Sequence, residues 1–448
     1  MTACDSDMSF DFYQQRPLMV KFSNLNLSSD VGILLARQAD EQLHICHTLA
    51  ECIEEWREPS KIVHPLPQLV CQRVLQLVAG YEDANDSDAL RHDPIFKIAC
   101  DRLPVPREDS LASQPTISRL ENHVTKADNA AMRRAFIDQF ISSYEHPPSQ
   151  VTLDIDGWDD PTHGNQEQSA FHGYYGQHMY FPVLINEAHS GFPLVMQLRP
   201  GNSHPGKEVA GVLRWLFWRL RREWPGVSIT LRADAGFSLP EILNVCERSE
   251  VGYAIGFSSN AVLQRKIAHR LEQARVLHHL MGEKVRLFDD VYYAAGSWEE
   301  PRRMVMKAEW LAKGANPRFV VTNLDLSPQE LYDAFYVQRG TSEHPIKELK
   351  LGIQADRLSC SSFMANQFRL LLAQAAYLLM ITLRQAAQGT RFASAQVEKL
   401  RSCLIKGAAR VQLSTRRVLV ELASFCPFAE EIKLISARLL APFPLELS

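Results

Sequence analysis

Two carboxylates stand in a stretch that otherwise has the pattern of a buried strand. In VTLDIDGWDDPTHG, residues 151–164, apolar residues alternate with polar ones, and Asp154 and Asp156 share the polar side. An ionised carboxylate is almost never buried without a partner, because its removal from water costs several kcal/mol or more. The chain must therefore fold so that cations or hydrogen-bond donors reach this strand. Asp159 and Asp160, a few positions on, are expected to be ordinary loop residues.

The hydrophobic period of the chain changes near residue 150. Before it, apolar residues recur at helical spacing and predict an N-terminal all-α domain over residues 1–145. After it, five short runs have the composition of strands. They cover residues 151–156, 180–186, 193–198, 229–232 and 253–257.

The connections between these runs predict their order in a sheet. Short turns join the first three, which favours an antiparallel meander. An amphipathic helix over 206–223 then allows the fourth run to lie beside the first. Residues 146–260 are therefore expected to form an α/β fold, a mixed sheet with flanking helices. After a helical stretch near 260–280, strand-like segments predict an all-β insertion over 261–328, and the helical pattern of 329–448 completes the core.

Composition narrows the class of protein. With 46% hydrophobic and 22% charged residues, this chain of 448 residues has the make-up of a soluble globular protein. The segment FRLLLAQAAYLLMITLR, residues 368–384, is interrupted by Arg369 and Gln374, so it predicts a buried helix and no membrane span. A net charge of −4 gives no general sign of nucleic-acid binding, although basic residues crowd 214–222 and 399–417.

Cysteine usage favours reduced thiols in a cytoplasm. The nine cysteines are scattered without a CxxC pair, which argues against a disulfide framework or a zinc ribbon. His44, Cys46, His47 and Cys52 lie close together in the sequence, but on one helix they would alternate between faces. They therefore do not predict a metal site.

Two further acidic residues form a constellation with Asp156. Asp234, in ITLRADAGF, follows the fourth strand, and functional side chains collect at the carboxyl ends of strands in open α/β sheets. Glu343 lies in YVQRGTSEHPIKELK, residues 336–350, where Ser342 is expected to cap a helix. Alone, each acid fits a turn or a surface ion pair. The spacing of the set Tyr336, Arg339, Glu343 and Lys350 argues for a shared function.

These segments resemble a bacterial insertion-sequence transposase of the DDE class, which has a ribonuclease-H-like core. The Tyr-(2)-Arg-(3)-Glu-(6)-Lys signature is typical of one branch, which also carries a β-rich insertion between the second Asp and the Glu. The other similar segments are LDIDGWDDPTHGNQE, FHGYYGQHMYFP, LRADAGF, KAEW with NPRFVVTNL, DRLSCSSFMANQFRLLLAQAAYLLM, GYEDANDSDALRHDP and LASQPTISRLEN. The resemblance covers nearly the whole chain.

The resemblance implies a catalytic triad of Asp156, Asp234 and Glu343 that binds two Mg²⁺ ions, for which Mn²⁺ can substitute. Two such ions about 3.5–4 Å apart clamp a scissile phosphate. It also implies cut-and-paste transposition by a homodimer in a synaptic complex, in the bacterial cytoplasm at the nucleoid. The enzyme would bind terminal inverted repeats, cleave the DNA ends by hydrolysis and join the freed 3′-OH to target DNA.

Particular parts of the chain are implied to hold the DNA. The N-terminal domain would bind transposon ends and dimerise, and the insertion would cover the active site. The residues implied to contact DNA are Tyr336, Arg339, Lys347 and Lys350, with His163 and Arg232 as secondary candidates.

Some alternatives stay open. Trp158 stands where the family usually has Thr or Ser, two residues after the first catalytic Asp. Asp154 shares a strand face with Asp156 and is a second candidate metal ligand, although Asp156 lies nearer the strand end. Two other functions also fit the sequence, a metal-dependent DNA nuclease without strand transfer and a DNA-binding regulator derived from a transposase.

Overall fold

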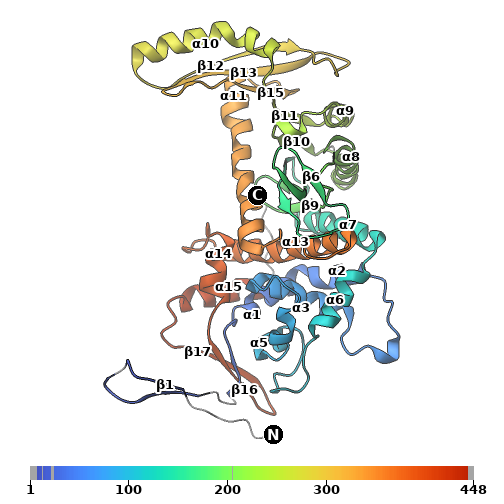
Figure 1. Ribbon diagram of the computed structural model, residues 1–448, viewed down its shortest axis with the longest axis vertical. Helices are drawn as coiled ribbons and strands as arrows, with labels where there is room; N and C mark the ends of the chain where they lie inside the picture. Colours follow the sequence, from blue (N-terminus) through green and yellow to red (C-terminus); the bar gives the residue numbers. More distant parts are fainter. Residues whose placement is uncertain (1–7, 13, 22–24, 204, 442–448) are drawn as a thin grey trace.

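The computed structural model describes residues 8–12, 14–21, 25–203 and 205–441; the side chains of residues 10, 205–207 and 341–344 lie outside this description. The molecule is elongated, with a large sheet in its upper part and the N-terminal helices below (Figure 1). Helix α13 (Phe363–Ala386) lies between the two parts. One hydrophobic core runs through both.

The central sheet has the strand order predicted from the connections. β4 (Gln150–Gly157) pairs antiparallel with β8 (Val183–Glu187), and β8 pairs antiparallel with β9 (Pro193–Gln197). β10 (Ser228–Ala233) lies parallel to β4 on its other side, followed by β11 (Gly252–Phe257), parallel to β10. All five residues of β8 are buried, as expected for a strand covered on both faces.

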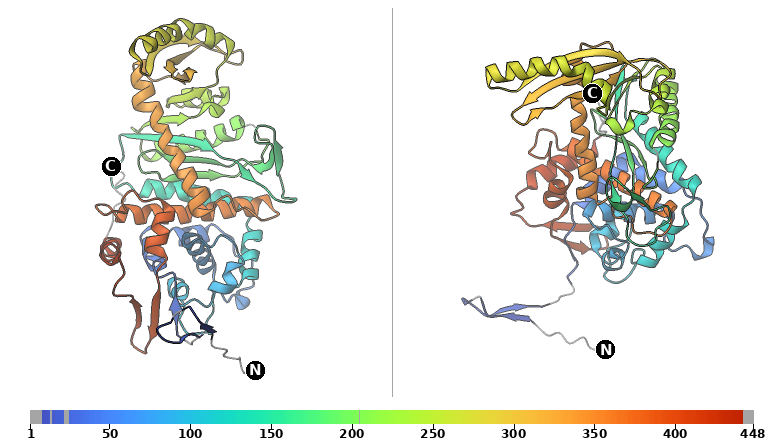
Figure 2. Two further views of the ribbon diagram at one scale, coloured as in Figure 1. Left: turned by 60° about the vertical axis from the view of Figure 1, so that its left-hand side comes forward. Right: turned by 45° about the horizontal axis from the view of Figure 1, so that its top comes forward.

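Helices cover the two faces of this sheet. α8 (Pro205–Glu223) connects β9 to β10, and α9 (Pro240–Arg248) connects β10 to β11. These two helices pack against each other on one side of the sheet, and the long helical segment 328–353 crosses the other side (Figures 1 and 2). The central part is therefore a three-layered α/β arrangement.

The helical stretch expected near residues 260–280 is present, so the insertion is β-rich and not all-β. Residues 261–281 form the helix α10 (Ala261–Met281), because Asn260 caps its first turn and Gly282 ends it in a left-handed conformation. The expected strands follow, and they do not form a separate sheet: β15 pairs antiparallel with β11, so the insertion extends the central sheet to nine strands. The inserted strands are β12 (Val285–Tyr293), β13 (Arg302–Leu311), β14 (Gly314–Ala315) and β15 (Arg318–Thr322).

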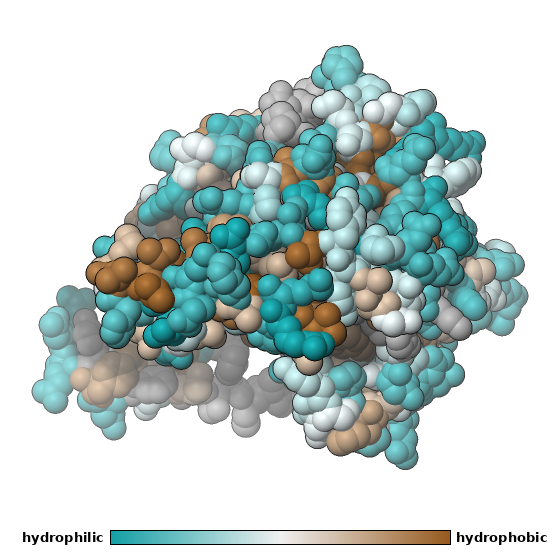
Figure 3. Space-filling model, turned by 90° about the horizontal axis from the view of Figure 1, so that it is seen from above, coloured by the Kyte–Doolittle hydropathy of each residue, from teal (hydrophilic) through white to brown (hydrophobic). Residues whose placement is uncertain are grey.

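The far end of the insertion exposes apolar side chains. Viewed onto this end, Figure 3 shows a largely hydrophilic surface with apolar atoms gathered at one edge. The last turns of α10 contribute exposed Val276, Leu277, Leu280 and Met281. These side chains add nothing to the core of this chain and leave an apolar surface at the tip.

The N-terminal part is mostly helical but is not all-α. β1 (Met8–Phe10) and β2 (Leu18–Val20) form a hairpin, and β3 (Leu27–Ser28) pairs with β16 near the other end of the chain. Its helices are α1 (Ile33–Leu43), α2 (Ile45–Glu51), α3 (Leu66–Ala79), α4 (Asp86–Leu90), α5 (Pro94–Ala99), α6 (Gln114–His123) and α7 (Lys126–Ser142), with the 3₁₀ turn η1 (Pro59–Lys61).

The C-terminal segment packs on those N-terminal helices. α1 and α3 contact α13, and α1 also contacts α15, so residues 1–145 share their core with the end of the chain. The later elements are α14 (Val397–Leu400), the π-helical turn η6 (Arg401–Ile405), β16 (Ala409–Leu413), β17 (Val418–Leu422) and α15 (Ala429–Leu440).

The helical segment 328–353 is irregular. It begins with α11 (Pro328–Glu330), and α12 (Glu343–Lys347) lies in its middle, starting at Glu343 as expected. A π-helical turn and a 3₁₀ turn precede α12, and a second π-helical turn follows; they are η3 (Leu331–Tyr336), η4 (Val337–Ser342) and η5 (Glu348–Ile353). Pro345 lacks a backbone N–H, so the regular series of α-helical backbone hydrogen bonds is interrupted in α12. Such irregular turns are frequent at functional sites.

α13 is buried over almost its whole length, as predicted. Among the described residues no helix combines the length and apolar character that a membrane span needs. The polar side chains of α13 form hydrogen bonds with the edge strand β9 and the residue that follows it. Gln367 accepts a hydrogen bond from the N–H of Leu198 at 2.8 Å and donates one to the carbonyl of Met196 at 3.2 Å. Gln374 donates to the carbonyl of Pro193 at 2.6 Å.

These contacts predict the effect of removing one glutamine. Gln367→Met keeps the volume but leaves a buried N–H and a buried carbonyl without partners, so the free energy of unfolding should fall by about 1–3 kcal/mol. Urea unfolding followed by circular dichroism measures the change. Gln385→Met on the same helix is the matched control, since its Oε1 has no partner among the described residues, and it should change stability by less than about 0.5 kcal/mol. Equal losses in the two variants would contradict the assignment.

Candidate active site

Asp156 and Asp234 lie at the same edge of the central sheet. β4 and β10 run parallel, and Ile155 is paired with Ala233, so the next residue along each strand is an aspartate. Side chains that follow neighbouring parallel strands converge at the carboxyl edge of the sheet. Both aspartates are partly exposed there. The structure thus brings together two of the three predicted triad residues.

Local hydrogen bonds orient the two carboxylates. Asp156 Oδ1 accepts from the N–H of Gly157 at 2.8 Å. Asp234 caps the 3₁₀ turn η2 (Ala235–Phe237) and accepts from the N–H of Gly236 at 2.9 Å. The turn after β10 therefore fixes Asp234 by a backbone contact and leaves carboxylate oxygen atoms directed to the outside of the sheet edge.

Arg339 brings a positive charge to these acids. It lies on η4, and its Nη1 donates to Oδ2 of Asp156 at 3.1 Å, with both side chains 16% exposed. Burial lowers the pKa of Arg339, but Tyr336 and the carboxylates of Asp156 and Asp234 outweigh burial and raise it. Neighbouring carboxylates repel each other unless a cation lies close by. Arg339 therefore compensates part of the negative charge of Asp156 and Asp234.

Tyr336 packs into the same edge. A methyl group at Gly256 would lie 2.5 Å from the hydroxyl oxygen of Tyr336 and 3.0 Å from the backbone N of Ala235, so only glycine leaves room for this ring. Burial raises the pKa of Tyr336, with Arg339 acting in the opposite direction. The ring also contacts Tyr332 at 5.6 Å between centroids. This half-buried position favours a positioning role for Tyr336 over stacking on nucleotides.

Glu343 begins α12, and its side chain lies outside the described residues. Its helical segment is nevertheless fixed on both sides. Arg339, before it, contacts Asp156, and Lys350, after it, contacts Asp159 in the loop that follows β4. The backbone of Glu343 therefore belongs to a segment held against the active edge.

Lys350 is held by an acid that sequence reasoning assigned to an ordinary loop. Its Nζ donates to the carbonyl oxygen of Asp159 at 3.0 Å and to Oδ1 of Asp159 at 3.1 Å. The contact ties η5 to the loop three residues after Asp156. The only signal for it in the sequence is the position of Asp159 shortly after the strand that carries Asp156.

Asp160 was also expected to be an exposed loop residue and is buried. Neither of its carboxylate oxygens has a hydrogen-bond partner among the described residues. Burial, with a contribution from Asp356, raises the pKa of Asp160 well above its usual value. The side chain is therefore a buried acid next to Asp159, in an environment that favours its protonated form.

Asp154 and Arg232 are paired with each other, which corrects two secondary assignments. The Nε and Nη2 of Arg232 donate to the two carboxylate oxygens of Asp154 at 2.7 and 2.8 Å, and both side chains are buried. Nη1 of Arg232 donates to the carbonyl of Phe335 at 3.0 Å. Asp154 is therefore engaged in a buried ion pair, which argues against a role as metal ligand, and the burial of Arg232 argues against contact with DNA.

The remaining predicted positions lie around the edge. Lys347 is exposed on α12. His163 is exposed in the loop between β5 (Asp160–Pro161) and β6 (Ala170–His172), where its N–H donates to Gln166 at 3.1 Å. Trp158 is buried, so the family's small hydroxyl is replaced here by a core side chain.

An aromatic hairpin beside the acids was missed as a functional element. β6 and β7 (Gln177–Tyr180) expose Phe171 by 56%, Tyr174 by 86% and Tyr175 by 41%. Burial raises the pKa of Tyr175, and Asp159, Asp234 and Asp156 add to the rise because their charges are close. The segment FHGYYGQHMYFP had been read only as a resemblance, without a role for its rings.

The donor set fits divalent cations of the hard type. Asp156 and Asp234 offer carboxylate oxygens at one partly exposed edge, and such oxygens are the ligands that Mg²⁺ takes in phosphoryl-transfer sites. Arg339 already shows that this edge attracts positive charge. The described residues therefore suit metal-assisted chemistry on a phosphate.

Comparison with known proteins gives the family. A family model described as "Transposase DDE domain group 1" matches residues 10–442. No curated protein matches the sequence. Among solved structures, a piggyBac transposase synaptic complex with hairpin DNA is similar at 12% sequence identity and a TM-score of 0.42, over 94% of this chain and 85% of that one. Since the family model spans nearly the whole sequence, the chain belongs to the group 1 family of transposase DDE domains.

Proposed function

We propose that the protein is a DNA transposase that binds the terminal inverted repeats of its mobile element, cleaves the DNA ends and joins the freed 3′-OH to target DNA. The observation that carries the proposal is the edge at which β4 and β10 end, where Asp156 and Asp234 lie on neighbouring parallel strands beside Arg339. Membership of the DDE transposase family supports the same chemistry.

The proposed catalytic triad is Asp156, Asp234 and Glu343, on a ribonuclease-H-like core. These residues would hold two Mg²⁺ ions, or Mn²⁺ in their place. Bound there, the ions would supply activation of the attacking hydroxyl and stabilisation of the leaving oxygen. The protein's own part is to fix the carboxylates: the turn after β10 orients Asp234, and the helical segment 328–353 carries Glu343 to the edge.

Arg339 has a second use in this scheme. Its guanidinium balances part of the charge of Asp156 through the contact at 3.1 Å. Divalent cations at the carboxylates would take over that balance and leave the guanidinium for a DNA phosphate, which it can bind in bidentate fashion. We therefore assign Arg339 to the phosphate next to the scissile bond.

DNA would lie along the edge and against the insertion. Lys347 and Lys350 are placed on the same helical segment to meet phosphates. The aromatic hairpin, through Phe171, Tyr174 and Tyr175, offers exposed rings for unpaired bases at the transposon end, since base–aromatic stacking tolerates any sequence. The insertion is proposed to grip the transposon end in a homodimeric synaptic complex, in which two ends are held together in the bacterial cytoplasm.

One reaction mixture separates this proposal from the two alternatives. Purified protein is incubated with DNA carrying the element's terminal inverted repeat, a second DNA as target, and Mg²⁺ or Mn²⁺. A transposase nicks at the repeat boundary and yields strand-transfer products, which gel electrophoresis resolves. Cleavage without regard to the repeat would indicate a nuclease, and binding without cleavage a regulator.

The triad predicts that a variant can lose cleavage and still bind DNA. Asp234→Asn removes a carboxylate charge from the metal site and should lower cleavage at least about a hundredfold, since even partners of ligand residues are worth about 10–100-fold. Binding to the repeat, measured by gel shift without metal, should change little. Asp138→Asn, 56% exposed and paired with Arg219, is the control and should cleave normally. Cleavage by Asp234→Asn at the control rate would remove Asp234 from the triad.

The contact between Gly256 and Tyr336 predicts a rescue. Gly256→Ala would displace Tyr336 and with it Arg339, so strand cleavage should fall, whereas Tyr336→Phe alone should have a mild effect. In the double variant the hydroxyl that meets the new methyl is gone, so part of the activity should return. Neighbouring residues couple by about 0.5–3 kcal/mol, a two- to hundredfold range in rate. Strictly multiplicative effects of the two substitutions on the cleavage rate would refute the contact.

A further inference from the structure

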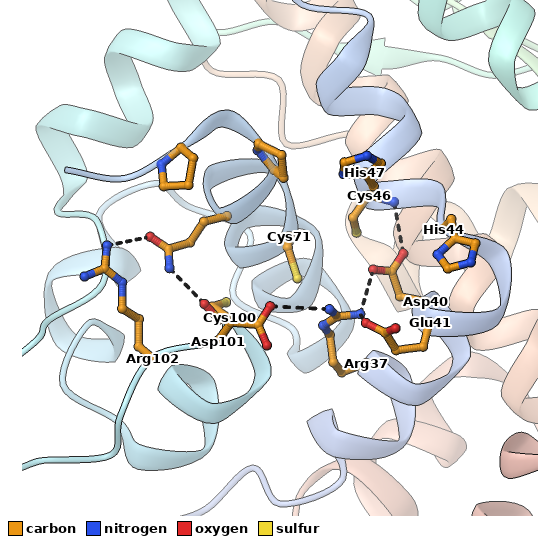
Figure 4. Close-up of a pocket in the computed structure, with 13 residues that line it drawn as sticks. Arg37, Asp40, Glu41, His44, Cys46, His47, Cys71, Cys100, Asp101 and Arg102 are labelled. Carbon is orange, nitrogen blue, oxygen red and sulfur yellow. Dashed lines mark hydrogen bonds and ion pairs between the residues drawn. The ribbon is translucent and has the colours of Figure 1, made fainter. Parts of the chain in front are cut away.

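Two thiols and a carboxylate converge in the N-terminal helices, far along the chain from the triad. Asp40 comes from α1, Cys46 from α2 and Cys71 from α3, and their ligand atoms all lie within 4.8 Å of one another. Figure 4 shows the two sulfur atoms and the Asp40 carboxylate directed toward one another. All three residues are buried. The sequence alone suggested no such cluster, because its members come from three different helices.

A break between two helices creates the arrangement. α1 ends at Leu43, and His44 adopts a left-handed conformation with φ 53° before α2 begins. The turn brings the N–H of Cys46 onto Oδ1 of Asp40 at 2.9 Å. A left-handed conformation costs a residue other than glycine about 1–3 kcal/mol, and such strain gathers at functional sites.

A third thiol lies beside the first two. Cys100 follows α5 as its C-terminal cap, and Asp101 after it is again left-handed, with φ 57°. Cys100 lines the same cavity as Cys46 and Cys71. Four segments of the N-terminal part thus each contribute one group of a kind that binds metals.

The charges of the cluster call for a cation. Arg37 reaches Asp40 only at 3.4 Å, and it also pairs with Glu41 and Asp101 and donates to a backbone carbonyl. Its charge is therefore shared among several acids. A thiolate and a carboxylate this close in a buried place are stabilised when a cation lies between them.

The cluster is open to a cavity through which an ion can enter. The cavity has a volume of about 470 Å³ and reaches Asp40, Cys46, Cys71 and Cys100. Other polar side chains also line it, among them His44, His47, Gln68 and Arg102. The cluster is therefore buried, and the cavity gives an ion a path to it.

We propose that Asp40, Cys46 and Cys71 bind a zinc ion, with Cys100, which lines the same cavity, in the fourth position. Tetrahedral zinc with bonds of about 2.0–2.3 Å places its ligand atoms about 3.3–3.8 Å apart, within reach of small side-chain rotations here. Thiolates select zinc over the hard cations proposed for the triad. The ion would join α1, α2 and α3 and the end of α5, and α3 packs on α13. The site is independent of the DNA chemistry.

The first test measures metal content. Full-length protein is purified without chelators or metal-affinity steps and analysed by inductively coupled plasma mass spectrometry. One zinc per chain is expected. Cys71→Ser should reduce the zinc at least about tenfold, whereas Cys52→Ser should retain it, because Cys52 donates to the carbonyl of Thr48 at 3.3 Å outside the cluster. Zinc at the same level in Cys71→Ser, or another metal in its place, would overturn the proposal.

The second test does not depend on a variant that folds. The wild-type protein is stripped with a chelator and titrated with Co²⁺, which should produce thiolate-to-cobalt charge-transfer absorption and the intense visible bands of a tetrahedral site. Zinc should then displace the cobalt and raise the unfolding temperature of the stripped protein. No such absorption, or a disulfide between Cys46 and Cys71 found by mass spectrometry of the freshly purified protein, would refute the site.

Discussion

The buried pair of Asp154 and Arg232 holds the active edge together. It lies one pleat below Asp156, where β4 and β10 are in register, and Arg232 also donates to the carbonyl of Phe335 on the segment that carries Tyr336 and Arg339. The guanidinium of Arg232 therefore connects β4, β10 and the helical segment 328–353. Removing one partner of such a pair typically costs about 3–5 kcal/mol, because the other charge is left alone in the interior.

The strands that build this edge were predictable because their signals are local. The runs at β4, β8, β9, β10 and β11 are apolar and bounded by turns, and the short and long connections between them gave the order of the sheet. The same holds for α13, whose apolar run with two polar interruptions predicted a buried helix. The resemblance added the identity of Asp156, Asp234 and Glu343, which spacing alone left undecided.

What could not be predicted depends on partners distant in the sequence. The alternation of apolar and polar residues places Asp154 and Asp156 on the same face of β4. Their different environments follow from the register of β4 against β10, which pairs Arg232 with Asp154. Asp159 was set aside because nothing near it in the sequence points to Lys350, which approaches through the tertiary fold. Likewise, Cys46 was judged by its neighbours on one helix, whereas its partners lie on α1 and α3.

The pairing of β15 with β11 has a mechanical consequence. The insertion is joined to the strand next to β10 by an antiparallel ladder of backbone hydrogen bonds, so it belongs to the same sheet as the strands that end at Asp156 and Asp234. A force on the tip of α10 would therefore act on this sheet through hydrogen-bonded strands. The distance between the tip and the two aspartates would give such a force leverage over the edge where they lie.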